Sequence, residues 1–416
     1  MSALKNYRTS LILIGAIVVG AVAGLIFKER ATAVQPIGQL FLNMLFMLVT
    51  PLVFFCIAAA VANVAAAKRI GHLALGLVGV FFGTSIIAGI LGLVGFMIVP
   101  VLAHADVSAI TALMDPSNTP KQGTIGQQIV GTFTVSDFAN LLSKQYMLPL
   151  IVFSAFLGFV ATRLGDKSAS VVRFFETGRD LMLKTMTYVM VVAPVGIACY
   201  FAATIGTLGS QILQGYLRGF IVYTVIGLVY FFGVFSVYAL IARGPAGVAA
   251  FWKNIITPAA MSVSTCSSAA CIPVSLDATR RMGVSKMVSD TAIPLGTNIH
   301  KEGSVIGGVF KIVFAFALFG REFNAWTLLA AVGVAVLVGT TMVAIPVGGM
   351  VAELMILTIF GFPAQAMPIL LVISTIIDPM ATMLNATGQC ASAMVVNRFV
   401  GAGEPADEAE LALATA

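Results

Sequence analysis

The chain has 416 residues, of which 59% are hydrophobic and only 10% are charged, whereas soluble domains are about 45–50% apolar and about 25% charged. Its formal net charge is +6. A soluble fold of this size needs a polar surface that this composition cannot supply, which argues against soluble enzymes, nucleic-acid-binding proteins and disordered proteins. A mild basic excess is typical of membrane proteins, because Lys and Arg collect in cytoplasmic loops. We therefore expect an all-α polytopic membrane protein.

Six apolar runs in the first part of the chain are long enough to cross a bilayer, which takes about 20 apolar residues. These runs are 10–27, 38–65, 74–102, 145–164, 185–207 and 219–242. Basic residues gather between the second and third runs, between the fourth and fifth, and after the sixth, whereas 103–143 is poor in bases. The positive-inside rule then predicts cytoplasmic N- and C-termini and an extracellular loop at 103–143.

From about 254 to 400 the apolar runs are interrupted by polar and helix-breaking clusters at 262–273, 294–303 and 339–349. Irregular backbone at membrane depth survives only where it is buried in protein or lines a wet cavity. Two interrupted segments in corresponding places indicate the binding site of a transporter. We expect 262–273 and 339–349 to form two re-entrant hairpins, one entering from each side, related as inverted repeats.

A polar stripe follows in the last apolar segment. Its members recur at intervals of three or four residues, which places them on one helix face: Ser374, Asp378, Thr382, Asn385 and Gln389. A polar face inside a membrane is costly and faces a cavity or a partner helix. A hydrogen-bonded seam between helices is the alternative. Asp378 favours a binding site, because an isolated carboxylate there needs a cationic partner.

Consecutive ionisable residues, His300, Lys301 and Glu302, interrupt the predicted seventh span. This pattern predicts an unwound helix centre, with a short surface loop as the alternative. Lys311 and Glu353 are further ionisable residues in apolar surroundings. Lys311 could snorkel toward an interface, and the sequence assigns no role to Glu353.

The serines of the first predicted hairpin, Ser267 and Ser268, offer hydroxyls beside helix N-termini. Helix N-termini favour anionic groups such as a carboxylate. Packing within the membrane is the alternative role for these serines.

Several motifs together resemble the glutamate transporter family, the dicarboxylate/amino acid:cation symporters. The resemblance covers nearly the whole chain and rests on Phe41–Phe54, the APVG at 193–196, the SSAACIP at 267–273, the IPLG at 293–296, and the D-x-x-x-T-x-x-N-x-T-G of Asp378–Gly388. It implies eight transmembrane helices plus two re-entrant hairpins in a homotrimer. Each protomer would hold a static scaffold and a transport domain that moves like an elevator.

On this resemblance the chain divides into six parts: scaffold helices one and two at 1–72, transport-domain helix three at 73–102, an extracellular loop at 103–143, scaffold helices four and five at 144–212, the rest of the transport domain at 213–400, and a cytoplasmic tail at 401–416. The implied location is the cell (inner) membrane, with membrane lipid and a second and third copy of the chain as partners.

The resemblance also implies roles for the substrate-binding residues. Asp378 matches the aspartate that receives the substrate amino group, and Asn385 the asparagine that holds the α-carboxylate. Thr382 and Ser268 match the neighbouring threonine and the hairpin serine. The arginine that family members with acidic substrates carry three residues after the aspartate is Ala381 here, and the aspartate one turn before is Ser374. The sequence therefore predicts a neutral amino acid as substrate.

The family's cation positions are altered as well. We assign the coupling site, or its replacement, to Thr84, Ser85, Asn298, His300, Lys301, Glu302, Asn385 and Gln389, with Phe82 in place of a tyrosine. At about 4 Å, like charges repel by roughly 4 kcal/mol at an effective dielectric constant of 20. An ammonium at Lys301, balanced by Glu302 and Glu353, would take the place of sodium. Proton coupling, exchange and no coupling stay open, and no other cofactor is expected.

We therefore predict a secondary active transporter of neutral amino acids that is not an enzyme. A sodium- or proton-coupled symporter of acidic amino acids or dicarboxylates is the main alternative. Two other classes remain: an ion channel, since charged cavities can conduct ions, and an intramembrane hydrolase that uses Ser267 or Ser268 with Lys301.

Overall fold

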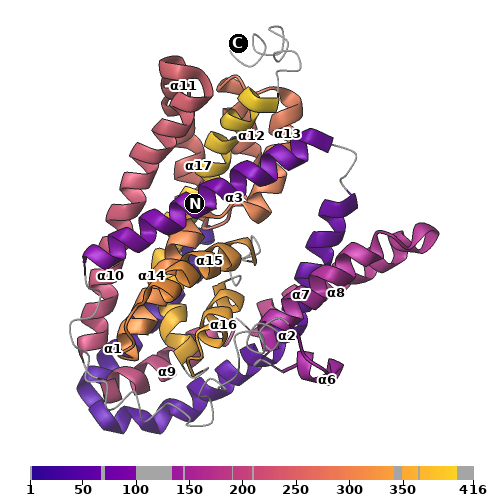
Figure 1. The fold of residues 1–416 in the computed structure, drawn as a ribbon. Coiled ribbons are helices and arrows are strands. Elements are labelled where there is room, and N and C mark those ends of the chain that lie inside the picture. The colour runs from indigo at the N-terminus through magenta and orange to yellow at the C-terminus, as the bar shows by residue number, and fades with distance from the viewer. Residues whose placement is uncertain are drawn as a thin grey trace.

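The computed structural model describes residues 2–66, 71–99, 134–143, 146–189, 191–208, 210–341, 349–363 and 366–400. These residues are helical for the most part, and no β-strand occurs among them (Figure 1). The all-α prediction is confirmed. The predicted tail at 401–416, most of the predicted loop at 103–143 and the tip of the second hairpin at 342–348 lie outside the described residues.

The first half of the chain forms helices close to the predicted apolar runs. They are α1 (Ser2–Phe27), the 3-10 segment η1 (Lys28–Val34), α2 (Gln35–Ala66), α3 (Gly71–Ile98), α6 (Phe138–Leu141), α7 (Met147–Ala161), η5 (Gly165–Lys167), α8 (Ser168–Val189) and α9 (Ala193–Leu208). α1 packs on α9, and α2 packs on α7, α8 and α9. α3 packs instead with helices of the second half, chiefly α14, α15 and α17.

The predicted basic loop between the fourth and fifth spans is wrong, because most of it is helix α8. Phe175 and Gly178 are buried on one side of α8, whereas Arg173 and Asp180 are exposed on the other. This charged, amphipathic helix lacks the continuous apolar run by which a span is recognised. α8 meets α9 at a bend of 64° and extends away from the rest of the molecule (Figure 1).

The second half forms α10 (Ser210–Val229), the π-helical segment η6 (Tyr230–Val234), α11 (Phe235–Thr265), α12 (Ile272–Arg281), α13 (Lys286–Ile299), α14 (Glu302–Leu318), α15 (Ala325–Thr341), α16 (Gly349–Ile359) and α17 (Met367–Val400). α11 is kinked at Arg243 and Gly244, where Gly244 has φ +63°. The predicted sixth span at 219–242 ends at this kink.

Two pairs of antiparallel neighbours match the predicted hairpins. α11 and α12 pack on each other across the turn 266–271, where Cys266 adopts a left-handed conformation. α15 and α16 pack on each other on either side of residues 342–348. The helix–turn–helix at 262–273 is therefore confirmed as a backbone shape, while its entry into a membrane stays a prediction.

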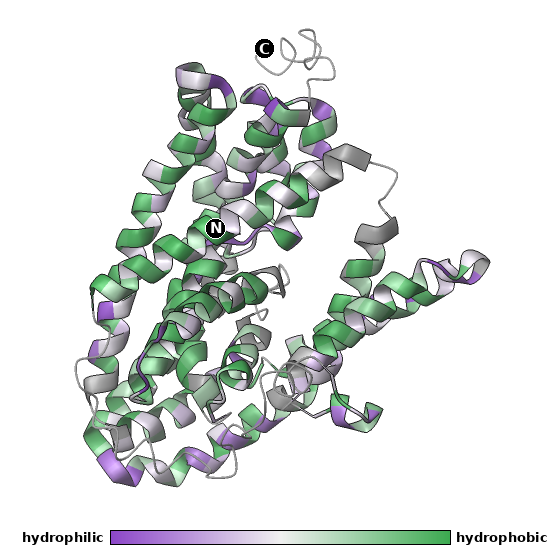
Figure 2. Cartoon of the chain, viewed as in Figure 1, coloured by the Kyte–Doolittle hydropathy of each residue, from purple (hydrophilic) through white to green (hydrophobic). Residues whose placement is uncertain are grey.

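Three described helical stretches are long and apolar enough to cross a bilayer: Gly76–Ile98, Leu213–Thr265 and Ile369–Phe399. A fourth counts if the bent pair α8 and α9 forms one span. Apolar residues cover most of the helices, and hydrophilic residues gather at several helix ends (Figure 2). The prediction of eight spans stays a prediction.

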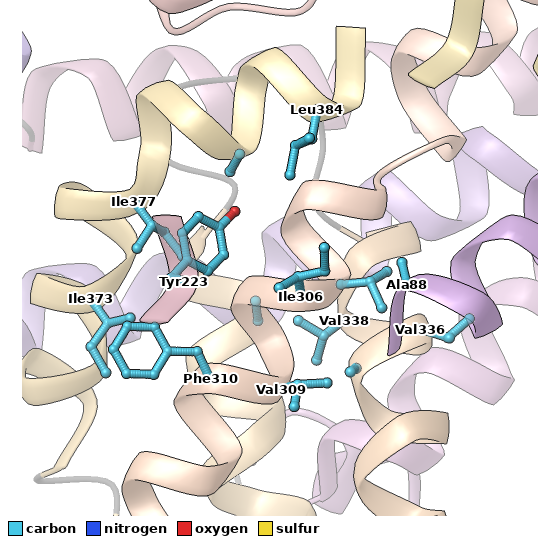
Figure 3. Close-up of a cluster of buried hydrophobic side chains, with 14 of the residues drawn as sticks. Ala88, Tyr223, Ile306, Val309, Phe310, Val336, Val338, Ile373, Ile377 and Leu384 are labelled. Atoms are coloured by element: carbon cyan, nitrogen blue, oxygen red, sulfur yellow. The ribbon is translucent and has the colours of Figure 1, made fainter. Parts of the chain in front are cut away.

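Helix α14 lies at the centre of the second half, and nearly all of its residues are buried. Ile306, Val309 and Phe310 of α14 meet Ile373, Ile377 and Leu384 of α17 in an apolar cluster that also includes Ala88, Tyr223, Val336 and Val338 (Figure 3). This packing fixes α14 against α17, which carries the polar stripe.

Candidate functional site

The helix break between α13 and α14 is buried inside the protein. His300 (φ −93°, ψ +104°) and Lys301 (φ −138°, ψ +49°) leave the helical conformation. Their side chains are 0% and 4% exposed, and Glu302, the first residue of α14, is 0% exposed. The unwound centre is confirmed and the surface-loop alternative is wrong. The break is narrower than the predicted 294–303, because residues up to Ile299 remain helical.

His300 collects polar groups from three helices. Its Nε2 lies 3.2 Å from the hydroxyl of Thr84 on α3 and 3.0 Å from the hydroxyl of Ser392 on α17. The same atom lies 3.4 Å from a carboxylate oxygen of Glu302. Within the part of the chain that the structure describes, His300 Nδ1 and both Glu302 oxygens have no hydrogen-bond partner.

Helix α17 passes this charged cluster at Gly388. A β-carbon at that position would collide with the Glu302 carboxylate and with the His300 ring. The glycine of the D-x-x-x-T-x-x-N-x-T-G motif therefore provides the space that the two ionisable side chains occupy.

Asn385 caps the start of α14. Its side-chain oxygen accepts hydrogen bonds from the backbone N–H groups of Gly303 (2.9 Å) and Ser304 (3.3 Å), and its amide donates to the Ser304 hydroxyl (3.0 Å). These backbone donors have no partner inside the helix and need one from elsewhere. The predicted stripe thus contacts the predicted break, since α17 supplies the cap of α14.

Asp378 lies nearby on the same face of α17. The Thr382 hydroxyl donates to the Asp378 carboxylate over 3.3 Å. Two ammonium groups, those of Lys301 and Lys311, are close enough to act on Asp378 electrostatically. Ala381 is 6% exposed and its backbone lies against Gly303. No cationic side chain extends from α17 at the position where family members with acidic substrates carry arginine.

The suggestion that Lys311 snorkels is wrong. Its side chain is 1% exposed, and its ammonium lies 2.7 Å from a carboxylate oxygen of Glu353, which is 0% exposed. The Ser374 hydroxyl lies 2.9 Å from the same ammonium and donates to the same carboxylate oxygen over 2.5 Å. Glu353 therefore pairs with Lys311 and does not balance Lys301, as we had expected from the sequence.

The remaining predicted coupling residues divide between the cluster and the surface. Gln389 accepts a hydrogen bond from the Thr297 hydroxyl over 3.2 Å, and Ser85 is 1% exposed. Asn298 is exposed and donates to the carbonyl of Pro294, one turn back, so it does not join the cluster.

The assignment of Phe82 to the place of the family's tyrosine is wrong. Phe82 is 51% exposed, whereas Phe81 is 2% exposed and its ring centroid lies 4.8 Å from that of His300. Neighbouring residues differ by about 100° around a helix, so an offset of one residue exchanges an inward side chain for an outward one.

Sequence reasoning missed four polar groups around the break. Ser304 and Ser392 contact Asn385 and His300, as described above, and Thr297 contacts Gln389. The Tyr230 hydroxyl donates to the Thr84 carbonyl over 3.3 Å and lies 3.1 Å from the Tyr238 hydroxyl. Ser392 continues the spacing of the stripe by three residues beyond Gln389, so the stripe's periodicity could have identified it.

The serines of the first hairpin lie in the turn between α11 and α12. Ser267 accepts a long hydrogen bond (3.4 Å) from the Ala270 backbone N–H, and Ser268 is 5% exposed. Both arms of this hairpin pack on α17. The hydroxyl of Ser268 has no hydrogen-bond partner among the described residues, so it is free to bind a ligand.

Comparison with known proteins gives a consistent result. The sequence profile of the Sodium:dicarboxylate symporter family matches residues 10–399. The chain is 24% identical to the Proton/glutamate-aspartate symporter of Bacillus subtilis, over 92% of this chain and 93% of that protein. It is 26% identical to the C4-dicarboxylate transport protein of Leptothrix cholodnii (93% and 87%) and 22% identical to the human Excitatory amino acid transporter 2 (94% and 79%).

Proposed function

Because this chain belongs to the Sodium:dicarboxylate symporter family, we propose that it is a secondary active transporter that moves amino acids with neutral side chains. The observation that carries this proposal is the polar face of α17. On that face Asp378 and Asn385 stand on either side of Ala381, with Thr382 bonded to Asp378. A carboxylate and an amide suit the two ends of an amino-acid backbone, and alanine suits a side chain without charge.

In the proposed complex, the Asp378 carboxylate accepts the substrate ammonium. Asn385, Thr382 and the unpaired hydroxyl of Ser268 hold the α-carboxylate. Relatives of this chain bear the names of glutamate, aspartate and C4-dicarboxylates. A second candidate is therefore transport of an acidic amino acid, and the two ammonium groups near Asp378 favour it. The Lys311–Glu353 pair supports the neutral substrate, because it leaves that ammonium already paired.

We further propose that coupling differs from ordinary sodium symport. Lys301 is a buried ammonium at the helix break and acts on Asp378. Sodium binding needs several oxygen ligands, and a fixed positive charge nearby opposes it. In this proposal Lys301 supplies the positive charge of a coupling cation. The buried pair of His300 and Glu302 leaves proton coupling as the other arrangement to be tested.

The elevator mechanism, the homotrimer and the inner-membrane location with cytoplasmic termini belong to the same proposal. The packing supports it: α1, α2, α7, α8 and α9 contact one another, and α3 joins α10–α17. In the elevator scheme the first group would be the scaffold and the second would be the mobile unit.

Binding to the purified chain in detergent tests the proposal. We expect a neutral amino acid from a panel of twenty to raise the melting temperature, equally in sodium, potassium and choline at pH 6 and pH 8. Asp378→Asn should abolish the shift and also uptake into proteoliposomes. Asp290→Asn, which removes a carboxylate from an exposed ion pair, is the matched control and should leave both unchanged.

Preferential binding of L-aspartate by the unmodified protein would overturn the neutral substrate. Strict dependence of binding on sodium at both pH values would overturn the role of Lys301. Binding without sodium that is lost in Lys301→Met would support that role.

A further inference from the structure

The buried ion pair of Lys311 and Glu353 is a feature that neither the fold nor the proposed binding of the amino-acid backbone requires. It joins three elements, since Lys311 is on α14, Glu353 is on α16 and their shared partner Ser374 is on α17. Replacing a buried ion pair by apolar residues of similar volume is often neutral or stabilising. Stability therefore gives no reason for these charges, and a role in function accounts for them better.

The position of the pair links it to the substrate. Ser374 precedes Asp378 by one helical turn on the same face of α17, about 6 Å along the axis. The Lys311 ammonium lies 2.9 Å from the Ser374 hydroxyl and acts electrostatically on Asp378. A side-chain carboxylate on a substrate held by Asp378 would therefore lie within the influence of this ammonium.

Glu353 neutralises that ammonium. One of its carboxylate oxygens accepts from both Lys311 and Ser374, while the other has no hydrogen-bond partner among the described residues. Glu353 thus supplies from the protein the carboxylate that an acidic substrate would bring. It also adds a negative charge that repels a second carboxylate.

We infer that Glu353 is a specificity-determining residue, an internal counter-ion that occupies Lys311 and so excludes amino acids with acidic side chains. The inference rests on the proposed function, because it assumes an amino acid at Asp378. It differs from the absence of arginine at Ala381: the missing arginine removes one receptor for a carboxylate, whereas Glu353 blocks another that the protein still contains.

The test uses the full-length protein in detergent and measures binding of L-aspartate and its uncharged isostere L-asparagine by equilibrium dialysis. Glu353→Gln keeps the shape of the side chain and releases Lys311. We expect it to bind L-aspartate at least tenfold more tightly than the unmodified protein does, with a much smaller change for L-asparagine. Lys311→Met/Glu353→Gln removes both charges and should bind L-aspartate no better than the unmodified protein.

Two controls separate specificity from folding. Asp290→Asn makes the same change of charge at an exposed ion pair and should leave both affinities unchanged. Glu353→Met also releases Lys311 without adding a polar group and should reproduce the gain if Glu353→Gln does not fold.

An unchanged L-aspartate affinity in the folded single variants would overturn the inference, and so would an equal gain in the double variant. These outcomes differ from failure of the proposed function. The proposed function fails if the unmodified protein binds no neutral amino acid, whereas the inference concerns only the change in L-aspartate affinity among variants.

Discussion

Helix α14 takes part in two buried charged clusters that differ in how completely their atoms are paired. At its start, His300 and Glu302 lie 3.4 Å apart and leave both carboxylate oxygens and one ring nitrogen without hydrogen bonds among the described residues. About three turns later, Lys311 and Glu353 lie 2.7 Å apart with Ser374 on both of them. Buried polar groups are normally paired, so the first cluster has the capacity to bind something and the second is already occupied.

The largest expected effect comes from breaking the paired cluster on one side. Lys311→Met leaves Glu353 buried without a counter-charge, which costs about 3–5 kcal/mol. We expect this loss in the free energy of unfolding, measured by denaturant titration in micelles. Lys311→Met/Glu353→Leu should recover most of it. A single variant as stable as the double variant would show that Glu353 tolerates isolation.

The unpaired cluster can be broken from the opposite helix. In Gly388→Ala the new methyl group collides with Glu302 and His300, and overpacking of this kind costs about 1–3 kcal/mol. We expect lower stability in the same titration, together with weaker substrate binding. Gly333→Ala is the matched control, because Gly333 on α15 has open space around its β-position and alanine favours a helix. Equal stability of the two variants would contradict the close approach.

A smaller effect is expected at the cap that joins the two helices. Asn385→Ala removes the acceptor for the Gly303 and Ser304 N–H groups, and loss of such a cap costs about 0.5–2 kcal/mol. Asn385→Asp retains an acceptor and should recover part of this loss. Thermal unfolding in detergent measures both variants. If Asn385→Asp is no more stable than Asn385→Ala, the side chain does not act as a cap.

The smallest effect is expected for an exposed ion pair with the same short distance. Arg280 and Asp290 lie 2.7 Å apart, but their side chains are 39% and 43% exposed. Exposed pairs contribute about 0–1 kcal/mol, so Arg280→Gln should change the free energy of unfolding far less than Lys311→Met does. A similar loss in both variants would mean that burial does not determine the difference between the pairs.

The sequence predicted those parts of the site that depend on local order along the chain. The spacing of Asp378, Thr382, Asn385 and Gln389 specified one face of α17, and the run His300–Glu302 specified the break. Pairings over long distances could not be predicted, since Lys311 and Glu353 are 42 residues apart and their partners depend on how α16 packs.

Predictions that depend on helical phase or on hydropathy failed in other ways. Phe82 was placed one residue away from the inward-facing Phe81. Helix α8 was predicted as a loop, because its charges are the same whether they lie on a helix face or in a coil. Burial and phase are set by tertiary packing, which local composition does not encode.

The π-helical segment Tyr230–Val234 has a consequence for the spatial register of everything that follows it. In a regular α-helix, residues eight apart point about 80° away from each other, yet the hydroxyls of Tyr230 and Tyr238 lie 3.1 Å apart. The wider turn accommodates one surplus residue and brings both rings to the same side. Deleting one residue there would rotate the downstream helix by about 100°. The turn at 266–271 would then no longer face α17, so the length of this segment, as much as its composition, fixes where the first hairpin lies.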